Sequence, residues 1–204
     1  MEHNDNNFVR PINYSGLLTN LGPISPEHDL PFLWQWINDP EVAKYTLAIW
    51  PTHLYAEKEY VENLHKKDND ATFALEAKEE KKFIGMMGLH NISYRNGTAV
   101  TGAIIGDAEF RGKRYGGDAK MHLLYHAFEV LGLRKVCSAV KAYNVRSLRY
   151  LKTSGYEVEG VRKEMFYFEG CYHDEILLSI TRKDFLPKWR KYKKVLEKAN
   201  DLKS

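Results

Sequence analysis

A glycine-rich loop between an apolar strand and a helix constrains this chain more than any other feature of its sequence. The segment 106–119 reads GDAEFRGKRYGGDA and follows an apolar stretch directly. Glycines let backbone N–H groups converge on one point, and the first amides of the following helix point the same way. The positively charged residues of this segment are Arg111, Lys113 and Arg114. The loop therefore predicts a phosphate or pyrophosphate site, and the alternative is a basic surface turn.

Two common phosphate-binding patterns are absent from the sequence. The P-loop pattern GxxxxGK[ST] does not occur, and no GxGxxG follows the first expected strand. The loop therefore belongs to neither the P-loop class nor the dinucleotide-binding class of proteins.

Hydrophobic periodicity predicts a mixed α/β domain. Helices are expected at 25–39, at about 55–66, around 117–131 and at 145–154. Strands are expected at 72–78, 82–93, 98–107, 134–142, 157–168 and 171–181. Three consecutive strands followed by helix, strand, helix and hairpin match neither a regular strand–helix alternation nor a helix bundle.

The composition favours one domain, because 44% of the 204 residues are hydrophobic. We expect this domain to cover residues 8–185. No apolar run approaches the roughly 18 residues of a membrane helix, and the polar N-terminus does not resemble a signal peptide. Cys137 and Cys171 lack the spacing of metal ligands. We therefore expect a cytoplasmic protein with reduced thiols, no metal ion and no membrane partner.

The segment 186–204 is predicted to be a basic tail or helix. Residues 187–204 hold seven Lys or Arg against two acidic residues, whereas the whole chain has a net charge of only +3. Such a segment can contact nucleic acid or an acidic partner. Because the rest of the chain has no matching basic surface, we prefer a solvated helix and do not expect a nucleic-acid partner.

Four segments resemble the GNAT superfamily of N-acetyltransferases. The loop 111–116 is similar to the family's acetyl-CoA pyrophosphate loop. Residues 144–147 (NVRS), followed by Gly155-Tyr156, resemble its second cofactor motif. Residues 36–42 (WINDPEV) and 170–174 (GCYHD) resemble the first helix and the closing hairpin of the RimJ/RimL-like branch. These segments stand in the family's order and cover nearly the whole domain.

The resemblance implies an α/β (α+β) fold with a mixed, mostly antiparallel central sheet, splayed between its fourth and fifth strands and flanked by helices. It implies acetyl-CoA as cosubstrate, with the pantetheine arm in the splay. The residues that would bind it are Ile104, Ile105, Gly106, Arg111, Gly112, Lys113, Arg114, Tyr115, Gly116, Gly117, Asn144 and Ser147. Arg114 replaces the first loop glycine of the family, which costs about 1 kcal/mol if that position needs a positive φ.

The implied reaction is direct acetyl transfer to a primary amine. It needs a proton acceptor for the amine and a proton donor for the leaving thiolate. Leu151 stands where many family members carry a tyrosine acid, and Tyr150 lies about 100° away on the helix. Ser147 matches a serine that has been assigned the acid role in RimL-like enzymes. We therefore prefer Ser147 as the acid and keep Tyr150 as a weaker candidate.

The sequence offers several candidates for the base. Glu164 precedes Phe166, the position matching a base proposed in RimL-like enzymes, by two residues, so regular alternation places both on one strand face. Glu76, His90 and a water chain are equal alternatives. His173 and Asp174 are adjacent in a strand and point to opposite faces, so they are not expected to act as a pair.

The acceptor pocket should lie between the N-terminal helices and the last hairpin. The aromatic and histidine side chains available to line it are Trp34, Trp36, Tyr45, Trp50, His53, Phe166 and Tyr167, with Trp34 preferred as a core residue. Ring faces suit a cationic amine. A protein N-terminus, a polyamine, an amino sugar or another small amine all remain open, and so does a homodimer. The alternative function is a non-catalytic module that binds CoA or nucleic acid.

Overall fold

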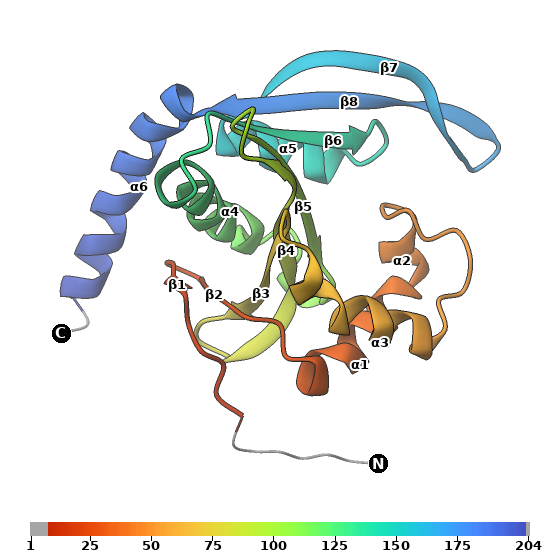
Figure 1. Cartoon of the computed structure of the whole chain (residues 1–204), viewed down its shortest axis with the longest axis horizontal. Coiled ribbons are helices and arrows are strands. Elements are labelled where there is room, and N and C mark those ends of the chain that lie inside the picture. Colours follow the sequence, from red (N-terminus) through yellow and green to blue (C-terminus); the bar gives the residue numbers. More distant parts are fainter. Residues whose placement is uncertain (1–7, 203–204) are drawn as a thin grey trace.

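The computed structural model describes residues 8–202, which form one eight-stranded sheet with helices on both sides (Figure 1). The strand order is β1-β2-β3-β4-β5-β6-β8-β7. All neighbouring strands are antiparallel except the parallel pair β5 and β6. The strands are β1 (Tyr14–Ser15), β2 (Thr19–Gly22), β3 (Ala71–Ala77), β4 (Lys82–Ser93), β5 (Thr98–Ile105), β6 (Lys135–Lys141), β7 (Glu157–Phe168) and β8 (Cys171–Thr181).

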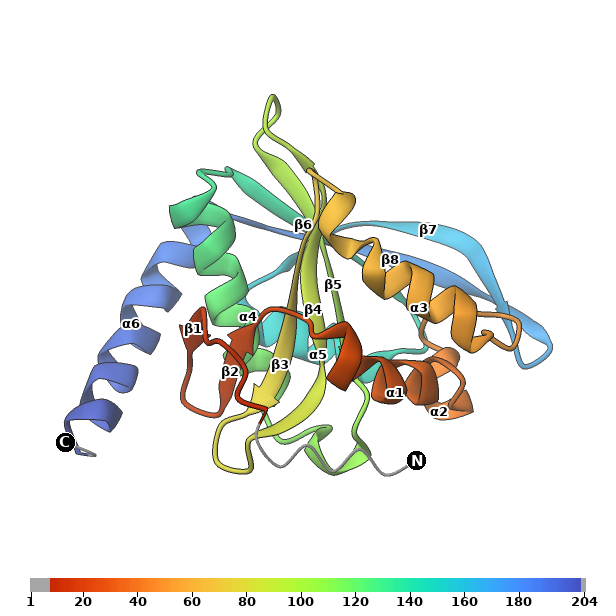
Figure 2. The ribbon, with the colours of Figure 1, turned by 60° about the horizontal axis from the view of Figure 1, so that its bottom comes forward.

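The helices cover the two faces of the sheet unequally. Figures 1 and 2 show α1, α2 and α3 on one side of the central strands and α4 and α6 on the other. The helices are α1 (Pro26–Ile37), α2 (Pro40–Ala43), α3 (Leu54–Glu62), η1 (Leu64–Lys66), η2 (Ala108–Phe110), α4 (Tyr115–Tyr125), η3 (His126–Val130), α5 (Val145–Ser154) and α6 (Arg182–Asp201). None of the helices within residues 8–202 combines the length and the apolar character needed to cross a bilayer.

The predicted splayed sheet is confirmed. Strands β5 and β6 pair only at residues 98–100 with 135–137 and then separate. They are the fourth and fifth strands when the two-residue β1 is not counted. The strands continue to Ile105 and Lys141, so a wedge-shaped gap opens toward their carboxyl ends.

Four expected elements have the predicted bounds, and others differ. The ranges 82–93, 145–154, 157–168 and 171–181 are each one element. The expected strand 98–107 ends at Ile105, because the Asp107 side chain accepts the Glu109 N–H and begins η2. The expected helix 55–66 is divided into α3 and η1. Strands β1 and β2 were not predicted, since two to four residues are too few for an alternation pattern.

The C-terminal basic segment is a helix that packs on the core through one face. Phe185 of α6 is fully buried, and the Trp189 ring stacks on Tyr125 at 4.7 Å. The α6 residue Tyr192 donates its hydroxyl to Asp118 Oδ1 at 2.7 Å. The helix therefore continues the hydrophobic core, and its lysines lie on the outward side.

Asp118 connects three separate parts of the chain. Its carboxylate accepts the N–H groups of Leu17, Leu18 and Thr19 at 2.9–3.0 Å, as well as the hydroxyls of Thr19 and Tyr192 at 2.7 Å. These bonds fix the turn between β1 and β2 and the helix α6 against α4. The two oxygens of one carboxylate can accept several hydrogen bonds at once, so this side chain joins all three segments. The start of α4, which belongs to the predicted pyrophosphate site, is thereby held in place.

Candidate functional site

The glycine-rich loop ends in a helix start with open space above it. Arg114 is the N-cap of α4 with φ 73° and ψ −2°, and Asp118 N–H donates to Arg114 O at 3.0 Å as the first helical bond. The amides of residues 115–117 therefore have no carbonyl in a preceding turn. A Cβ placed on Gly112 or Gly117 would meet no atom within 4 Å. This geometry fits a pyrophosphate on the helix N-terminus.

Arg114 does adopt the positive φ that the family pattern reserves for glycine. Relief of this conformation is worth about 1–2 kcal/mol, while a glycine gains about 0.4–1 kcal/mol of freedom in the unfolded chain. We therefore expect Arg114→Gly to raise the Tm by about 2 °C, because 1 kcal/mol corresponds to about 2–4 °C at this size. Lys113→Gly is the matched control, since the exposed Lys113 has no positive φ and should lose stability. Calorimetry of both variants checks this, and an Arg114→Gly protein less stable than wild type would contradict it.

Arg111 has a different place from the one that the sequence suggested. Its Nε donates to Ile105 O at 3.0 Å, and its Nη2 donates to Gly106 O. The guanidinium also lies 3.8 Å from Asp39 Oδ2. The Arg111 side chain thus fixes the end of β5. The exposed positive charges of the loop are those of Lys113 and Arg114.

Gly106 is a glycine because of close packing. A Cβ at this position would lie 1.8 Å from Cδ2 of Trp36. The Trp36 ring also stacks on Phe83 at 5.2 Å, so it cannot retreat easily. The contact joins α1 to the end of β5. It positions the strand end from which the predicted cofactor loop departs.

Where β5 has separated from β6, alternate residues of β5 turn their backbone groups toward the gap. Gly106 N–H donates to Ile84 O at 3.0 Å, and Ile104 O lies directly against Gly85 of β4. Both residues therefore turn their backbone groups toward β4. By alternation, Ala103 and Ile105 turn theirs toward the gap. Of the three strand residues predicted to pair with the pantetheine arm, Ile105 has the matching orientation.

The second predicted cofactor motif forms the start of α5. Asn144 is its N-cap and accepts the Ser147 N–H through Oδ1 at 3.1 Å, so the pairing has a helix-capping role. Ser147 is half-buried in the first turn. Leu151 is only 1% exposed and belongs to the core. The Tyr150 ring packs over Lys120 of α4, with Nζ 5.6 Å from its centroid.

Lys120 is a buried ammonium group that the sequence did not reveal. Its side chain is 0% exposed, and within residues 8–202 Nζ has no hydrogen-bond partner. The ring centroids of Tyr150 and Tyr156 lie 5.6 and 5.9 Å from Nζ. Burial lowers the pKa of Lys120 to about 7. Burying this amine without a hydrogen-bond partner therefore lowers the stability of the folded protein.

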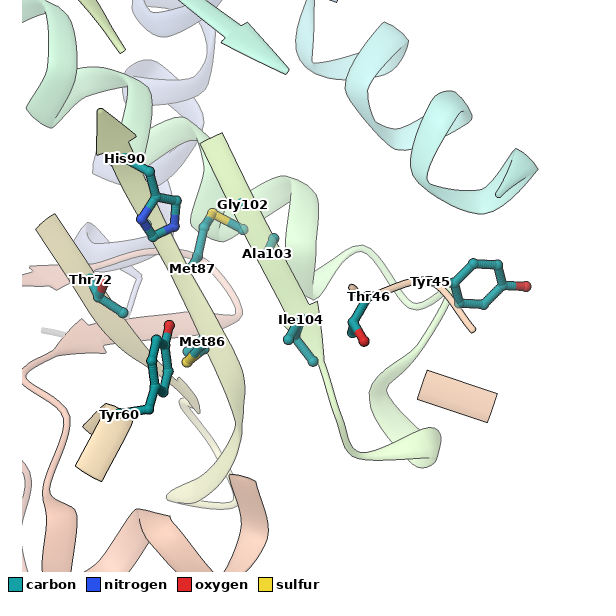
Figure 3. A pocket seen from close by; sticks show the side chains of 11 residues that line it. Tyr45, Thr46, Tyr60, Thr72, Met86, Met87, His90, Gly102, Ala103 and Ile104 are labelled. Atoms are coloured by element: carbon teal, nitrogen blue, oxygen red, sulfur yellow. The ribbon is translucent and has the colours of Figure 1, made fainter. Parts of the chain in front are cut away.

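A cavity of about 270 Å³ lies on the side of the sheet that carries α1–α3 (Figure 3). Its walls come from α3, from the segment after α2, and from β3, β4 and β5. The lining residues are Tyr45, Thr46, Tyr60, Thr72, Met86, Met87, Gly88, His90, Gly102, Ala103 and Ile104. The β5 residues of this wall belong to the part of the strand that has left β6. Residues 102–104 of β5 therefore border both the cavity and the gap beside β6.

His90 is the base candidate that lies in this cavity. Its Nδ1 is 3.2 Å from Asp70 Oδ2, and Asp70 Oδ1 accepts the Asn91 N–H at 2.9 Å. Burial raises the pKa of Asp70, but the hydrogen bonds from Asn91 and His90 and the charge of Lys67 outweigh it, so the pKa lies below its usual value. Asp70 is therefore a stable anion behind the imidazole.

The other base candidates lie elsewhere. Glu164 is exposed in a bulge between β7 and β8, with φ 54°, so the regular alternation with Phe166 that supported it is absent. Glu76 accepts Asn20 Nδ2 at 3.1 Å and lies 4.0 Å from Arg10 Nε, outside the cavity wall. His173 Nε2 lies 3.1 Å from Cys171 Sγ, and Asp174 Oδ2 accepts Lys163 Nζ at 2.8 Å, so the two side chains have different hydrogen-bond partners.

Most of the aromatic residues expected around the acceptor are not in the cavity wall. Tyr45 borders it, with its ring directed away from the other labelled side chains in Figure 3. Trp50 and Tyr167 are 78% and 67% exposed. Trp34, which we preferred as a core residue, is 39% exposed and donates Nε1 to Thr52 O. Tyr60 was missed, because its place facing β4 depends on how α3 packs.

The splayed sheet and the open helix start of α4 fit the fold of an acyltransferase. The family model "Acetyltransferase (GNAT) domain" matches residues 19–157, so the chain belongs to the GNAT family. The protein is an N-acetyltransferase that transfers an acetyl group from acetyl-CoA to an amine. The alternative of a non-catalytic module is therefore not supported.

Similar proteins agree with this assignment. The spermidine N(1)-acetyltransferase of Vibrio cholerae is 26% identical over 158 residues, which cover 78% of this chain and 90% of the relative. The uncharacterized N-acetyltransferase p20 of Bacillus licheniformis is 24% identical over 160 residues, covering 77% and 89%. The crystal structure of the Vibrio cholerae spermidine N-acetyltransferase with CoA and spermine has a TM-score of 0.74 at 24% identity, covering 83% and 98%, and supports the fold.

Proposed function

We propose that the acceptor is a small cationic amine of the polyamine type, bound in the cavity between α3 and strands β3–β5. The observation that carries this proposal is the cavity wall. It combines the Tyr60 ring with the thioether of Met86. Ring faces and methionine sulfur suit an alkyl chain with a positive charge. The related Vibrio cholerae enzymes named above act on spermidine or bind spermine, which agrees with this choice.

The charges around Tyr60 favour a cation as well. Burial raises the pKa of Tyr60, and the negative charges of Glu57 and Asp70 raise it further. Glu57 is only 8% exposed. Lys67 lies 3.8 Å from Asp70 and offsets one of these charges. Glu57, whose pKa burial raises, is the other carboxyl group beside Tyr60 and would face a second ammonium group of a polyamine.

A panel of amines tests the acceptor. CoA release is measured with spermidine, butylamine, glucosamine and a tripeptide with a free N-terminus. The proposal predicts the highest kcat/KM for spermidine, and a lower KM than for butylamine, because butylamine has the same reacting group but no second charge. If the tripeptide or glucosamine were the better substrate, the polyamine assignment would be wrong while the acetyltransferase assignment would stand.

The proposed cofactor contacts follow the open surfaces described above. Backbone amides of residues 111–117 would hold the pyrophosphate, with Lys113 and Arg114 supplying charge. Ile105 would pair with the pantetheine arm through its backbone N–H, since its carbonyl already accepts Arg111 Nε, and Gly106 and Ile104 would support that edge. Asn144 and Ser147 would border the arm from α5.

Ser147 remains the proposed proton donor to the leaving thiolate. It is half-buried in the first turn of α5, whereas Leu151 is in the core and Tyr150 packs on Lys120. Ser147→Ala should lower kcat by about 100-fold, at the lower end for loss of a general acid, with unchanged acetyl-CoA affinity. Thr153→Ala, an exposed hydroxyl of the same helix, is the matched control. Steady-state kinetics decide, and an unaltered kcat would assign Ser147 to structure alone.

Three broader assignments belong to the same proposal. The α1–α2 segment and the hairpin turn at Glu169-Gly170 support the RimJ/RimL-like branch. Both cysteines are free, which agrees with a reducing cytoplasm. A homodimer is a further proposal, which sedimentation can test. The boundary between a domain at 8–185 and a separate C-terminal segment is also a proposal.

A further inference from the structure

We propose that His90 and Asp70 act together as the base that takes the proton from the acceptor amine. The inference rests on the acceptor cavity of the proposed function. Asp70 lies just before β3, and His90 lies near the end of β4. The pairing of Ala71 with Leu89 brings the two residues opposite each other, with 3.2 Å between Oδ2 and Nδ1.

Asp70 is fixed in a way that determines the tautomer of His90. Its second oxygen accepts the Asn91 N–H at 2.9 Å, and Lys67 Nζ lies 3.8 Å from Oδ2. An anionic carboxylate at Nδ1 favours the proton on that nitrogen. Nε2 is then left as the proton acceptor of the neutral ring.

Two glycines clear the space around Nε2. A Cβ on Gly88 would lie 3.1 Å from Nε2, and a Cβ on Gly102 would lie 3.2 Å from it. The two glycines pair directly across β4 and β5. The imidazole therefore lies against the backbones of Gly88 and Gly102, and the wall residues Ala103 and Ile104 follow farther along β5 (Figure 3). This is the strand segment that separates the cavity from the gap.

The surrounding charged groups allow this role. Asp70 faces the ring from the segment before β3, with Lys67 behind it. Tyr60 is the titratable residue that α3 contributes to the cavity wall. From β5 the wall contains Gly102, Ala103 and Ile104, which do not titrate.

The proton and electron balance is complete with the known reactants. An alkylammonium loses one proton to His90 Nε2, and the imidazolium passes it to solvent. The amine lone pair then forms the N–C bond to the acetyl carbonyl carbon, and the C–S bond breaks. The second proton lost from nitrogen ends on the CoA sulfur. No oxidant, reductant or further reactant is required.

Chemical rescue tests the dyad. His90→Ala should lower kcat at least about 100-fold with spermidine and remove the rise of kcat with pH that an imidazole base produces near neutrality. Added imidazole should restore part of the rate, because the truncated side chain leaves room next to two glycines. Asp70→Asn should lower kcat less and also change the pH profile. His65→Ala, an exposed histidine of η1, is the matched control and should behave as wild type.

The outcomes separate this inference from the proposed function. Each variant is first checked for an unchanged thermal shift with acetyl-CoA, which shows an intact fold and cofactor site. Wild-type turnover together with an unaltered His90→Ala, or with a loss that imidazole and pH do not influence, overturns the dyad alone. A wild-type protein that binds acetyl-CoA but releases no CoA with any amine of the panel overturns the acceptor assignment, and the dyad with it.

Discussion

Gly116→Asp should abolish acetyl-CoA binding while leaving the fold intact. A Cβ at Gly116 would meet only Ile105 Cγ1, at 3.9 Å, so the larger side chain has space. The new carboxylate would stand in the first turn of α4, where an acidic residue stabilises a helix. The same position would repel a pyrophosphate by about 1–4 kcal/mol per charge at close range. We expect an increase in Kd of at least about 100-fold, measured by titration calorimetry.

The matched control is Gly160→Asp. Gly160 lies on β7, and a Cβ there would meet no atom within 4 Å, so the same substitution introduces the same charge at a different place. This variant should bind acetyl-CoA as the wild type does. If Gly116→Asp bound the cofactor normally, the loop would not hold the pyrophosphate.

Lys120→Met should stabilise the protein by a few kcal/mol near neutral pH. Lys120 is fully buried without a hydrogen-bond partner in the described part of the chain. Its pKa falls from 10.5 to about 7. This decrease of about 3.5 in the pKa corresponds to about 5 kcal/mol of differential stability. Methionine fills similar space without a charge, and apolar replacements of buried charges are often stabilising.

The sign of the pH effect follows from linkage. Between pH 7 and about 10.5 the unfolded chain keeps the lysine proton and the folded chain releases it, so the unfolded state binds more protons. The contribution of Lys120 to the free energy of unfolding therefore rises with pH in this range, and its full cost is present below pH 7.

Urea unfolding at pH 7, 8 and 9 measures this contribution. The wild type should gain stability relative to Lys120→Met as the pH rises, so the two curves should converge. Lys194→Met removes an exposed lysine of α6 and should keep the wild-type slope. Parallel curves for wild type and Lys120→Met would show that Lys120 is charged and solvated in the folded protein.

The sequence predicted the elements around the proposed cofactor loop more closely than those around the proposed acceptor cavity. Glycines, a strand and a helix stand next to each other in residues 98–125, so local rules suffice for the loop. The dyad depends instead on hairpin register, since Asp70 and His90 are twenty positions apart. The turn between β3 and β4 pairs Ala77 with Lys82, but a bulge between Leu75 and Glu76 then shifts the register by one residue, so counting from the turn would place Asp70 one residue out of line with His90.

Other features depend on packing that a sequence pattern does not contain. Asp118 and Lys120 are both polar residues of α4. The packing of β1, α5 and α6 makes Asp118 a hydrogen-bond acceptor for several segments and leaves Lys120 Nζ without a partner in the described part of the chain. The alternation that supported Glu164 does not hold, because a bulge interrupts β7 between Arg162 and Phe166. Arg111 looked like a phosphate ligand, but its hydrogen bonds to the carbonyls of Ile105 and Gly106 depend on the loop conformation.

Thermal unfolding with and without acetyl-CoA tests the central claim most directly, with ATP and NAD as controls. Acetyl-CoA at about 100 times its Kd adds about 2.7 kcal/mol to the free energy of unfolding. At this chain length that is an increase in Tm of about 5–10 °C. The account predicts this increase with acetyl-CoA and none with ATP or NAD. An unchanged Tm with acetyl-CoA would contradict an acetyl-CoA-dependent transferase whose cofactor binds at residues 111–117.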